Sequence, residues 1–379
     1  MGEASTSIRL NPFKGCDGPA GSPVPWSPYG RILSERPNFT LDPLFHAGCY
    51  YVQDSSAMYV GYIFRKLALP EGLPGMRVLD LCAAPGGKTT DLAASLRESF
   101  GSAFELTANE VIRGRASVLA DNISVWGDPC AAVTSVDPSV IGRTMKGYYD
   151  VIVADVPCSG EGMFRKDPRA VAEWTPELPG ICAARQRRIL ADAWPALREG
   201  GLLIYSTCTY EDCENDSNLE WAARELGGEI IPPENEFAQF GVELTRCGNL
   251  LRAGTVPGEG QWAGVLRKTL PQPAAARADL SELHPLRCGL RKGEMKGKDF
   301  QPDPDYALSI LFDREDYPAV DVDLQTALRY LHRDALVLPQ AAPGYNIISY
   351  LGHPLGFVKN IGSRCNNLLP KGRRILMNV

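Results

Sequence analysis

The sequence has 379 residues, of which 44% are hydrophobic and 22% are charged, and its formal net charge is −6. This length and composition predict two or three packed domains with a sizeable core, and they exclude a disordered or collagen-like chain. The acidic balance argues against a protein that coats nucleic acid through a uniformly basic surface. Any contact with nucleic acid must therefore come from local basic patches.

The cysteine and hydropathy patterns indicate a cytoplasmic protein. The eleven cysteines form an odd set with no C-x-x-C pair, and the four histidines have no ligand spacing, so we expect no disulfide framework and no metal. Residues 1–14 have no apolar run after a basic start, so no signal peptide is predicted. No stretch approaches the roughly 18 apolar residues of a membrane helix, and we expect no membrane partner.

The first part of the chain shows little regular pattern. Residues 1–48 are rich in proline, glycine and aromatic residues, which predicts an irregular segment packed on a larger body. From Tyr50 to Leu69 the apolar spacing predicts a helix that Pro70 ends.

Strand and helix patterns then alternate. Short apolar runs predict strands at 77–81, 104–108, 131–136, 149–154 and 202–206, with a late strand at 262–267. Helical patterns lie at 88–97, 115–126, 181–197 and 213–226. Because parallel strands are joined by helical crossovers, this alternation predicts a parallel, doubly wound α/β sheet.

The composition changes again near residue 271. A stretch rich in proline and alanine at 271–278 predicts a linker, and short strand patterns such as 345–350 and 355–359 follow it. We expect an N-terminal segment at 1–60, the α/β domain at 61–270, a linker at 271–283 and a smaller α+β or β-rich domain at 284–379.

A glycine-rich turn follows the first predicted strand. It reads Asp80-Leu-Cys-Ala-Ala-Pro-Gly-Gly-Lys-Thr89 and opens a helix. Its glycines allow close backbone approach, and the helix N-terminus offers free N–H groups to a nucleoside cofactor. The turn lacks the spacing of dinucleotide-binding and P-loop motifs, and alone it could be purely structural.

Two acidic residues strengthen the cofactor interpretation. Glu110 ends the second strand, twenty-three residues beyond Gly87, where a carboxylate can accept hydrogen bonds from ribose hydroxyls. Asp137 follows the third strand at the same edge of the sheet. Each carboxylate separately could be a solvated loop residue, but their shared position at strand ends favours a ligand site.

Two cysteines stand at the ends of neighbouring strands. The fourth strand ends in Asp155-Val-Pro-Cys158 and the fifth in Ser206-Thr-Cys208. A thiolate that adds to carbon 6 of cytosine makes carbon 5 nucleophilic enough to attack a methyl donor. An acid near ring nitrogen 3 stabilises the adduct, and a base must later remove the proton on carbon 5. Buried cysteines are more often small hydrophobic residues, which is the interpretation of the other nine.

These motifs identify a family. The chain resembles the Sun-type (NSUN) family of RNA cytosine-5 methyltransferases, which use S-adenosylmethionine. The motifs that carry this resemblance are Leu81–Lys88, Asn109-Glu110 with Arg115 and Asp121–Ile123, Asp155–Gly162 and Ser206–Thr209. Within the family, the chain looks most like the group that methylates cytosine in bacterial 16S ribosomal RNA. That closer likeness lies in Ser7–Asn11, Gly48–Ser56 and Met163–Pro168 with Trp174.

The resemblance implies a Rossmann-like sheet with a reversed last strand pair, an N-terminal RNA-recognition segment and a C-terminal PUA-like RNA-binding domain. It implies that Cys208 is the nucleophile, that Cys158 assists product release and that Asp155 contacts the cytosine ring. Lys88 would touch the cofactor or the target ribose. The implied positions for S-adenosylmethionine are Ala83, Ala84, Pro85, Gly86, Gly87, Lys88, Thr89, Glu110, Arg115, Asp137 and Asp155. Relatives often carry an additional helix before Arg9, so part of an N-terminal RNA platform is expected to be missing, and Val156 stands where alanine is commoner.

Charge is unevenly distributed along the chain. Residues 1–280 have a net charge of −8, whereas 324–379 have a net charge of +6. A second basic cluster comprises Arg287, Arg291, Lys292, Lys296 and Lys298. Such clusters suit phosphate contacts, and Tyr345, Tyr350 and Phe357 could stack on bases. Arg185, Arg187 and Arg188 could grip an RNA backbone, although a solvated surface with aromatic residues in the core explains each residue equally well.

The sequence thus predicts a cytosine-5 methyltransferase that acts on 16S rRNA or the small ribosomal subunit as a monomer. The alternatives are the same reaction on tRNA, and a ribosome-assembly factor that binds RNA without turnover. A thiol redox enzyme is disfavoured because no C-x-x-C motif is present.

Overall fold

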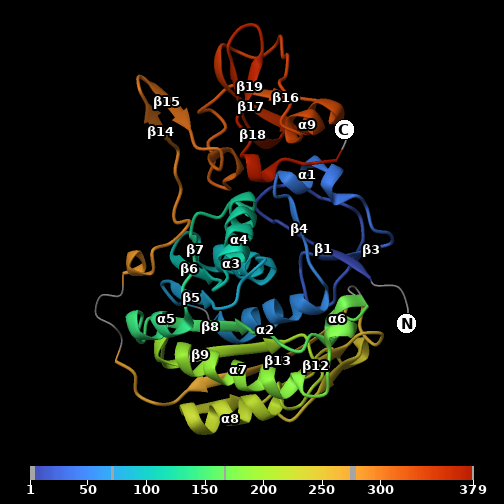
Figure 1. The fold of residues 1–379 in the computed structure, drawn as a ribbon, viewed down its shortest axis with the longest axis vertical. Helices are drawn as coiled ribbons and strands as arrows, with labels where there is room; N and C mark the ends of the chain where they lie inside the picture. Colours follow the sequence, from blue (N-terminus) through green and yellow to red (C-terminus); the bar gives the residue numbers. More distant parts are fainter. Residues whose placement is uncertain (1–4, 70–71, 166–167, 274–278, 378–379) are drawn as a thin grey trace.

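The computed structural model describes residues 5–69, 72–165, 168–273 and 279–377. Figure 1 shows a large sheet with its helices at one end, a C-terminal sheet at the other, and the N-terminal sheet beside the junction. Within the described residues these are a nine-stranded sheet, two four-stranded sheets and a two-stranded hairpin. The quoted motif Met163–Pro168 falls partly outside the described residues, at 166–167.

The large sheet has the strand order β11-β12-β13-β9-β8-β5-β6-β7, and β10 also pairs with β13. Its strands are β5 (Met76–Asp80), β6 (Phe104–Asn109), β7 (Ala131–Thr134), β8 (Tyr149–Asp155), β9 (Leu197–Thr207), β10 (Gly228–Ile231), β11 (Val242–Leu244), β12 (Gly248–Arg252) and β13 (Gly260–Lys268). Strands β5 to β9 are parallel, which confirms the predicted parallel core. The late strand β13 runs antiparallel to β9, as the resemblance implied.

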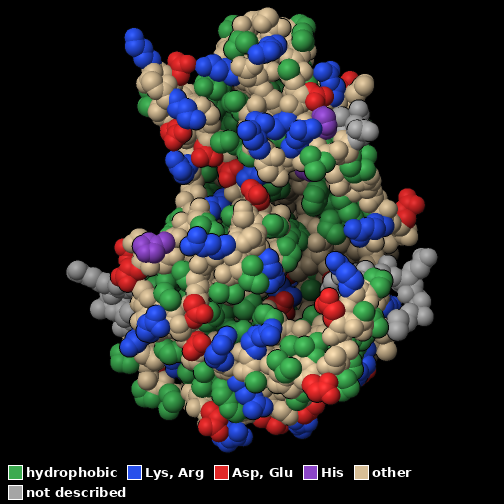
Figure 2. Space-filling view, viewed as in Figure 1, with side chains coloured by type: hydrophobic (Ala, Val, Ile, Leu, Met, Phe, Trp, Pro, Cys, Tyr) green, Lys and Arg blue, Asp and Glu red, His purple; other side chains and the backbone are tan. Residues whose placement is uncertain are grey.

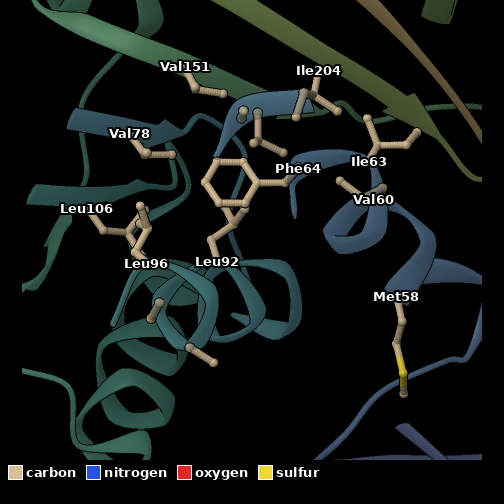
Figure 3. Close-up of a cluster of buried hydrophobic side chains, with 14 of the residues drawn as sticks. Met58, Val60, Ile63, Phe64, Val78, Leu92, Leu96, Leu106, Val151 and Ile204 are labelled. Atoms are coloured by element: carbon tan, nitrogen blue, oxygen red, sulfur yellow. The ribbon is translucent and has the colours of Figure 1, made fainter. Parts of the chain in front are cut away.

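Helices cover both faces of this sheet, because successive strand residues point to opposite sides. One face is covered by α2 (Tyr59–Ala68), α3 (Gly87–Phe100) and α4 (Arg113–Trp126). The other is covered by α5 (Pro138–Thr144), α7 (Leu178–Ala193) and α8 (Asp216–Leu226). In β5, Val78 joins the first core and Leu79 the second. Figure 3 shows Phe64 of α2 between Val78 of the sheet and Leu92 of α3.

The N-terminal residues form a sheet, so the prediction of an irregular segment at 1–48 is wrong. Its strands are β1 (Thr6–Leu10), β2 (Ser22–Pro23), β3 (Gly30–Leu33) and β4 (Tyr50–Val52), in the order β2-β3-β1-β4. The predicted helix at 50–69 begins only at Tyr59, because Tyr50–Val52 pairs with β1 instead. Aromatic and β-branched residues favour such pairing once a partner strand is available.

The C-terminal sheet contains β16 (Ala319–Asp321), β17 (Gly344–Tyr350), β18 (His353–Asn360) and β19 (Cys365–Asn367), in that order. The strands predicted at 345–350 and 355–359 are therefore confirmed. Helix α9 (Leu324–Leu331) packs beside them, and Asp323 caps it by accepting a hydrogen bond from Thr326 N at 2.8 Å. Strands β14 (Gly293–Lys296) and β15 (Asp299–Pro302) form the separate hairpin.

The N-terminal and C-terminal sheets share one hydrophobic core. Ile8 of β1 and Tyr50 of β4 belong to the same buried cluster as Tyr330 of α9 and Ile348 of β17. Burial of this surface holds the two ends of the chain together.

The predicted linker lies partly outside the described residues, at 274–278. Its last residues form the short helix η6 (Leu280–Leu283), in which Leu283 is fully buried against the large sheet's second core. Further on, Leu286 N donates a 2.7 Å hydrogen bond to Val133 O of β7, so the connecting segment covers that edge strand.

Several short helices complete the described residues. They are α1 (Pro43–His46), α6 (Pro168–Glu173), η1 (Phe39–Leu41), η2 (Ser56–Met58), η3 (Glu161–Met163), η4 (Trp194–Ala196), η5 (Ala238–Phe240), η7 (Tyr306–Leu308) and η8 (Lys371–Arg373). Among the helices of the described ranges, no helix has the length and apolar character to cross a membrane.

Candidate active site

The candidate site residues gather at the carboxyl edge of the parallel strands. Asp80 ends β5, Asn109 ends β6, Asp155 ends β8, and Cys208 directly follows β9. In open α/β sheets this edge is where ligands bind, because the strand order reverses there and leaves a crevice. The order β8-β5-β6 places that reversal at β5, directly beside the glycine-rich turn.

The glycine-rich turn is held by the ends of the strands. Ala83 N donates a 2.8 Å hydrogen bond to Asn109 O, and Thr89 Oγ1 donates one of 2.6 Å to Asp80 Oδ2. Gly86 has a φ of +114°, which a side-chain-bearing residue would adopt only with strain. Helix α3 starts at the next residue without a side-chain cap, so its first N–H groups remain available to a ligand.

Asp80 is the most unusual carboxyl group at this edge. It is completely buried, and its Oδ1 has no hydrogen-bond partner among the described residues. Burial raises the pKa of Asp80 to about 7, although the hydrogen bond from Thr89 opposes the shift. Asp80 begins the glycine-rich motif, but no local pattern in the sequence marks its carboxyl group as buried. A buried carboxyl with one free oxygen fits a cationic group, such as an amino-acid ammonium, arriving from the crevice.

The two carboxylates that were predicted at this edge, Glu110 and Asp137, have different surroundings. Glu110 is buried, and its carboxylate accepts a 2.9 Å hydrogen bond from Ile112 N and pairs with Arg115 at 3.3 Å. Arg115 also donates to Ala84 O at 3.0 Å, which joins Glu110 to the glycine-rich turn. Asp137 is exposed at the same edge, where it caps α5 by accepting bonds from Ser139 N and Oγ. These bonds lower the pKa of Asp137.

Lys88 and Asp155 form an ion pair inside the crevice. Lys88 Nζ lies 2.7 Å from Asp155 Oδ2, and Asp155 Oδ1 accepts hydrogen bonds from Ser206 Oγ at 2.8 Å and Gln261 Nε2 at 3.1 Å. Burial opposes the charge on Lys88, but Asp155 and Asp80 outweigh it and raise the lysine's pKa. Sequence reasoning missed Ser206 and Gln261 as partners. Gln261 comes from the antiparallel strand β13, whose position beside β9 no local pattern revealed.

The two predicted cysteines are in direct contact. Cys158 Sγ and Cys208 Sγ lie 3.1 Å apart, and Cys208 N donates to Cys158 Sγ at 3.3 Å. The hydrogen bond with Cys208, together with burial, raises the pKa of Cys158 well above its usual range. Cys158 therefore keeps its proton and can share it with the sulfur of Cys208 in a hydrogen bond.

Two carboxylates, of partly buried Glu161 and of buried Glu214, hold the two cysteine loops together. Glu161 Oε2 accepts bonds from Thr209 Oγ1 at 2.9 Å and Tyr210 N at 2.7 Å. Glu214 Oε2 accepts bonds from Ser159 N at 3.1 Å and Gln186 Nε2 at 2.7 Å. Glu161 belongs to the loop of Cys158 and binds the loop of Cys208, whereas Glu214 follows Cys208 and binds the loop of Cys158 and helix α7. The positions of the two sulfur atoms therefore depend on both carboxylates.

The N-terminal sheet reaches the glycine-rich turn through Arg9, which sequence reasoning did not treat as a site residue. Arg9 is fully buried; it donates to Gly87 O at 3.1 Å and to Thr90 Oγ1 at 2.5 Å, both at the start of α3. It also donates to Gln53 Oε1 at 2.9 Å, and its guanidinium lies 4.7 Å from the centre of the Trp126 ring. The signal available in the sequence was a charged residue within an apolar strand.

Only some of the residues that were expected to contact RNA are exposed. Phe357 is 1% exposed and belongs to a core cluster, so the expectation that it stacks on RNA is wrong. Arg287 is half-buried and donates to Ser124 Oγ at 2.9 Å and Ala131 O at 2.8 Å, so it anchors the connecting segment. Arg187 binds Asn218 Oδ1 at 2.7 Å, whereas Arg185 and Arg188 are exposed.

A hollow separates the catalytic and C-terminal parts of the molecule. Figure 2 shows it between the upper and lower parts of the face in view, with basic side chains around its rim. The cavity there has a volume of about 370 Å³ and is lined by residues of all three parts, including Tyr51, Asn122 and Leu369. Tyr51 Oη and Asn122 Nδ2 both donate to Pro85 O, so the hollow adjoins the glycine-rich turn.

The fold defines a Rossmann-like methyltransferase. A methyltransferase homologue from Pyrococcus horikoshii is 28% identical with a TM-score of 0.55, covering 70% of this chain and 87% of that one. NSun6 from the same organism, crystallised with SFG, shares the fold at 24% identity and a TM-score of 0.53, covering 62% of this chain and 57% of that one.

Sequence comparison identifies the family. Ribosomal RNA small subunit methyltransferase F of Klebsiella pneumoniae is 32% identical over 92% of this chain and 84% of its own, and the Escherichia coli protein is 31% identical over the same shares. Three family models match: the N-terminal domain of 16S rRNA methyltransferase RsmF at residues 1–55, 16S rRNA methyltransferase RsmB/F at 70–230 and the methyltransferase RsmF PUA domain at 317–375. The chain belongs to the RsmF family of methyltransferases, as the motifs of the sequence indicated.

Proposed function

We propose that this chain methylates carbon 5 of a cytosine in 16S ribosomal RNA, through a covalent bond between Cys208 and carbon 6 of the base. The observation that carries the proposal is the 3.1 Å contact between Cys158 and Cys208 at the carboxyl edge of the sheet, beside the Lys88–Asp155 pair. The curated relatives are named for the small-subunit ribosomal RNA, which supports the choice of substrate.

S-adenosylmethionine would bind along the glycine-rich turn and supply an electrophilic methyl group. Ala83 to Thr89 would contact it with backbone groups, with Lys88 at the methyl-donor end. Glu110, held by Arg115, would accept hydrogen bonds from the ribose, and Asp137 would border the far end. The free oxygen of buried Asp80 would bind the ammonium of the amino-acid moiety.

Cys208 would start the reaction as a thiolate. The ammonium of Lys88 interacts electrostatically with Cys208, and the thiol of Cys158 contacts its sulfur directly. The sulfur lone pair forms the bond to carbon 6, and the electrons of the 5,6 double bond make carbon 5 nucleophilic. Carbon 5 then takes the methyl group, whose bond to the donor sulfonium breaks. Asp155, fixed by Lys88, would contact the polar edge of the cytosine ring during these steps.

Product release reverses the addition. A base removes the proton on carbon 5, the 5,6 double bond forms again, and the Cys208–carbon 6 bond breaks. Cys158 assists because its S–H donates a hydrogen bond to the departing thiolate of Cys208. The contact between Cys158 and Cys208 would thus act both when Cys208 adds to the base and when it leaves.

The remaining parts of the chain would hold the RNA. We propose that the N-terminal segment (1–60) and the PUA-like domain (284–379) flank the catalytic domain (61–270) and bind RNA across the hollow in Figure 2. The target cytosine must leave its stack to reach Cys208, which costs a few kcal/mol, so an accessible loop is methylated faster than the same sequence in a perfect duplex. We propose that the enzyme acts in the cytoplasm as a monomer.

The test is transfer of labelled methyl groups from S-adenosylmethionine to 16S RNA, to assembled small subunits and to tRNA, followed by bisulfite mapping. We expect label at cytosine 5 in small-subunit RNA, a loss of roughly 10³-fold or more in Cys208→Ala, and unchanged transfer in Cys288→Ala, which alters an exposed cysteine away from the site. Label in tRNA alone would overturn the substrate assignment. No label in any RNA, with RNA binding intact, would identify a binding factor without turnover.

A further inference from the structure

Three potential metal ligands meet away from the catalytic cysteines. Cys16 lies in the loop after β1, Cys49 directly precedes β4, and His353 is the first residue of β18. Their ligand atoms all lie within 4.8 Å of one another. Spacing along the sequence predicted no metal, because the third ligand belongs to the C-terminal sheet and only the fold brings it to the other two.

The arrangement suits a small soft cation. Zinc binds sulfur at about 2.3 Å and imidazole nitrogen at about 2.0 Å, so tetrahedral ligand atoms are about 3.5 to 3.8 Å apart. Small side-chain rotations that move the sulfur and nitrogen atoms by roughly 1 Å would bring them to the separations of a zinc site. Two sulfurs and one nitrogen match the preference of zinc over magnesium or calcium, which favour oxygen.

The surroundings leave these groups available. Cys49 is fully buried, Cys16 and His353 are half-buried, and all the cysteines are free in the described chain. Neither ring nitrogen of His353 has a hydrogen-bond partner among the residues with described positions. Burial and the contact with Cys16 raise the pKa of the Cys49 thiol, and the ammonium of Lys14, which donates to Leu308 O, opposes this shift only in part. A buried cluster of this polarity gains most from a ligand that satisfies all three groups at once.

The position of the cluster indicates what the ion would do. Cys49 belongs to the hydrophobic core that the N-terminal and C-terminal sheets share, and the three ligands come from both sides of that core. We propose that Cys16, Cys49 and His353 bind one Zn²⁺, with a water molecule as fourth ligand, and so cross-link the N-terminal sheet to the C-terminal domain. Binding displaces one proton from each thiol, and neutral His353 releases none.

The test measures zinc bound to the full-length protein after purification with a non-thiol reductant. We expect about one equivalent per chain in the wild type, and Co²⁺ in its place should give the absorption of a tetrahedral thiolate complex. Affinity should fall by more than about 100-fold in Cys16→Ser, Cys49→Ser and His353→Ala. Cys288→Ser, at an exposed cysteine, and Cys208→Ser, in the catalytic pair, should both keep the metal.

The His353→Ala variant separates metal loss from misfolding, because His353 is only half-buried. Zinc should raise the unfolding temperature of the wild type and leave that of His353→Ala unchanged. The proposal is overturned if the wild type binds no zinc or cobalt at saturation, if His353→Ala retains the ion, or if Cys208→Ser loses it. A Cys16–Cys49 disulfide that survives the reductant would also overturn it.

Discussion

The sulfur atoms of Cys158 and Cys208 lie 3.1 Å apart although fifty positions separate the two residues in the chain. The contact arises because β8 and β9 are parallel neighbours, so their carboxyl ends coincide. The hydrogen bond with Cys208 and burial raise the pKa of Cys158, so Cys158 retains its proton within the pair.

Replacing Cys158 by alanine should uncouple methyl transfer from release. The thiolate of Cys208 then leaves without a hydrogen-bond donor, and we expect a covalent protein–RNA adduct visible as a slowly migrating band on a denaturing gel. The adduct should be absent from the Cys158→Ala/Cys208→Ala double variant. Normal turnover of Cys158→Ala, without the band, would contradict the two-cysteine scheme.

Replacing Lys88 by methionine should slow methyl transfer more than RNA binding. The change removes the charge that positions Asp155 and leaves that carboxylate with Ser206 and Gln261 alone. Single-turnover rates should fall by about 10²-fold, the usual effect of losing one electrostatic contact in a closed site, and Lys88→Arg should be intermediate. Lys66→Met is the control, because the ion pairs of Lys66 are with the exposed carboxylates of Glu234 and Glu236. Equal rates for Lys88→Met and wild type would exclude this role.

The affinity for S-adenosylmethionine should depend on pH through Asp80. Because its pKa is about 7, Asp80 is protonated below that pH and cannot pair with an ammonium. Binding should therefore strengthen as pH rises from 5.5 to 7.5, by up to about tenfold per unit below the pKa. Asp80→Asn should remove this component, while the titration of the ligand itself remains. Calorimetric measurement of the affinity for S-adenosylmethionine across this pH range, in two buffers, tests the prediction. Identical pH profiles for the wild type and Asp80→Asn would refute it.

The raised pKa of Asp80 also makes the free energy of unfolding depend on pH. The free energy of unfolding falls as the pH rises, whereas cofactor binding strengthens. Between about pH 4 and pH 7 the unfolded chain has lost the Asp80 proton that the cofactor-free folded protein retains. The contribution of Asp80 to the free energy of unfolding therefore decreases as the pH rises through this range. Urea unfolding of the wild type and Asp80→Asn should converge toward low pH.

Replacing Arg9 by methionine should weaken both the fold and the cofactor turn. The change removes hydrogen bonds to Gly87 and Thr90. It also removes a 3.9 Å ion pair between Arg9 and Asp91, but Asp91 keeps its 2.8 Å ion pair with Arg65. We therefore expect a loss of about 2 kcal/mol in the free energy of unfolding, rather than the larger cost of a stranded buried charge. Weaker binding of S-adenosylmethionine should accompany it. A stability loss without any change in affinity would limit Arg9 to a structural role.

The parallel core was predictable because each of its strands is a short, continuous apolar run bounded by turn residues. The N-terminal sheet was not, because β2 has two residues and β4 three, and β4 pairs with β1 across about forty residues. Such pairing depends on tertiary contacts and leaves no local periodicity. The pairing of Tyr50–Val52 with β1 also explains why α2 begins at Tyr59 and not, as predicted, at Tyr50.

The position of the proposed catalytic residues was predictable for a related reason. Cys158, Cys208 and Asp155 stand at strand ends, and parallel topology alone brings strand ends together. Arg9 and Gln261 were missed because they reach the site from the N-terminal sheet and from the antiparallel strand β13. Phe357 was misassigned because β18 is buried on both faces from Leu355 to Val358, and the residues that cover it lie elsewhere in the chain, where no local pattern reveals them.

The core that joins β1 and β4 to α9 and β17 also constrains how the chain folds during synthesis. Ile8 and Tyr50 emerge from the ribosome early, but their partners Tyr330 and Ile348 emerge only after the whole catalytic domain. Until then the N-terminal sheet presents an uncovered apolar face to the solvent, where it is open to aggregation or to a chaperone. The catalytic sheet therefore gains its N-terminal neighbour in final form only at the end of translation.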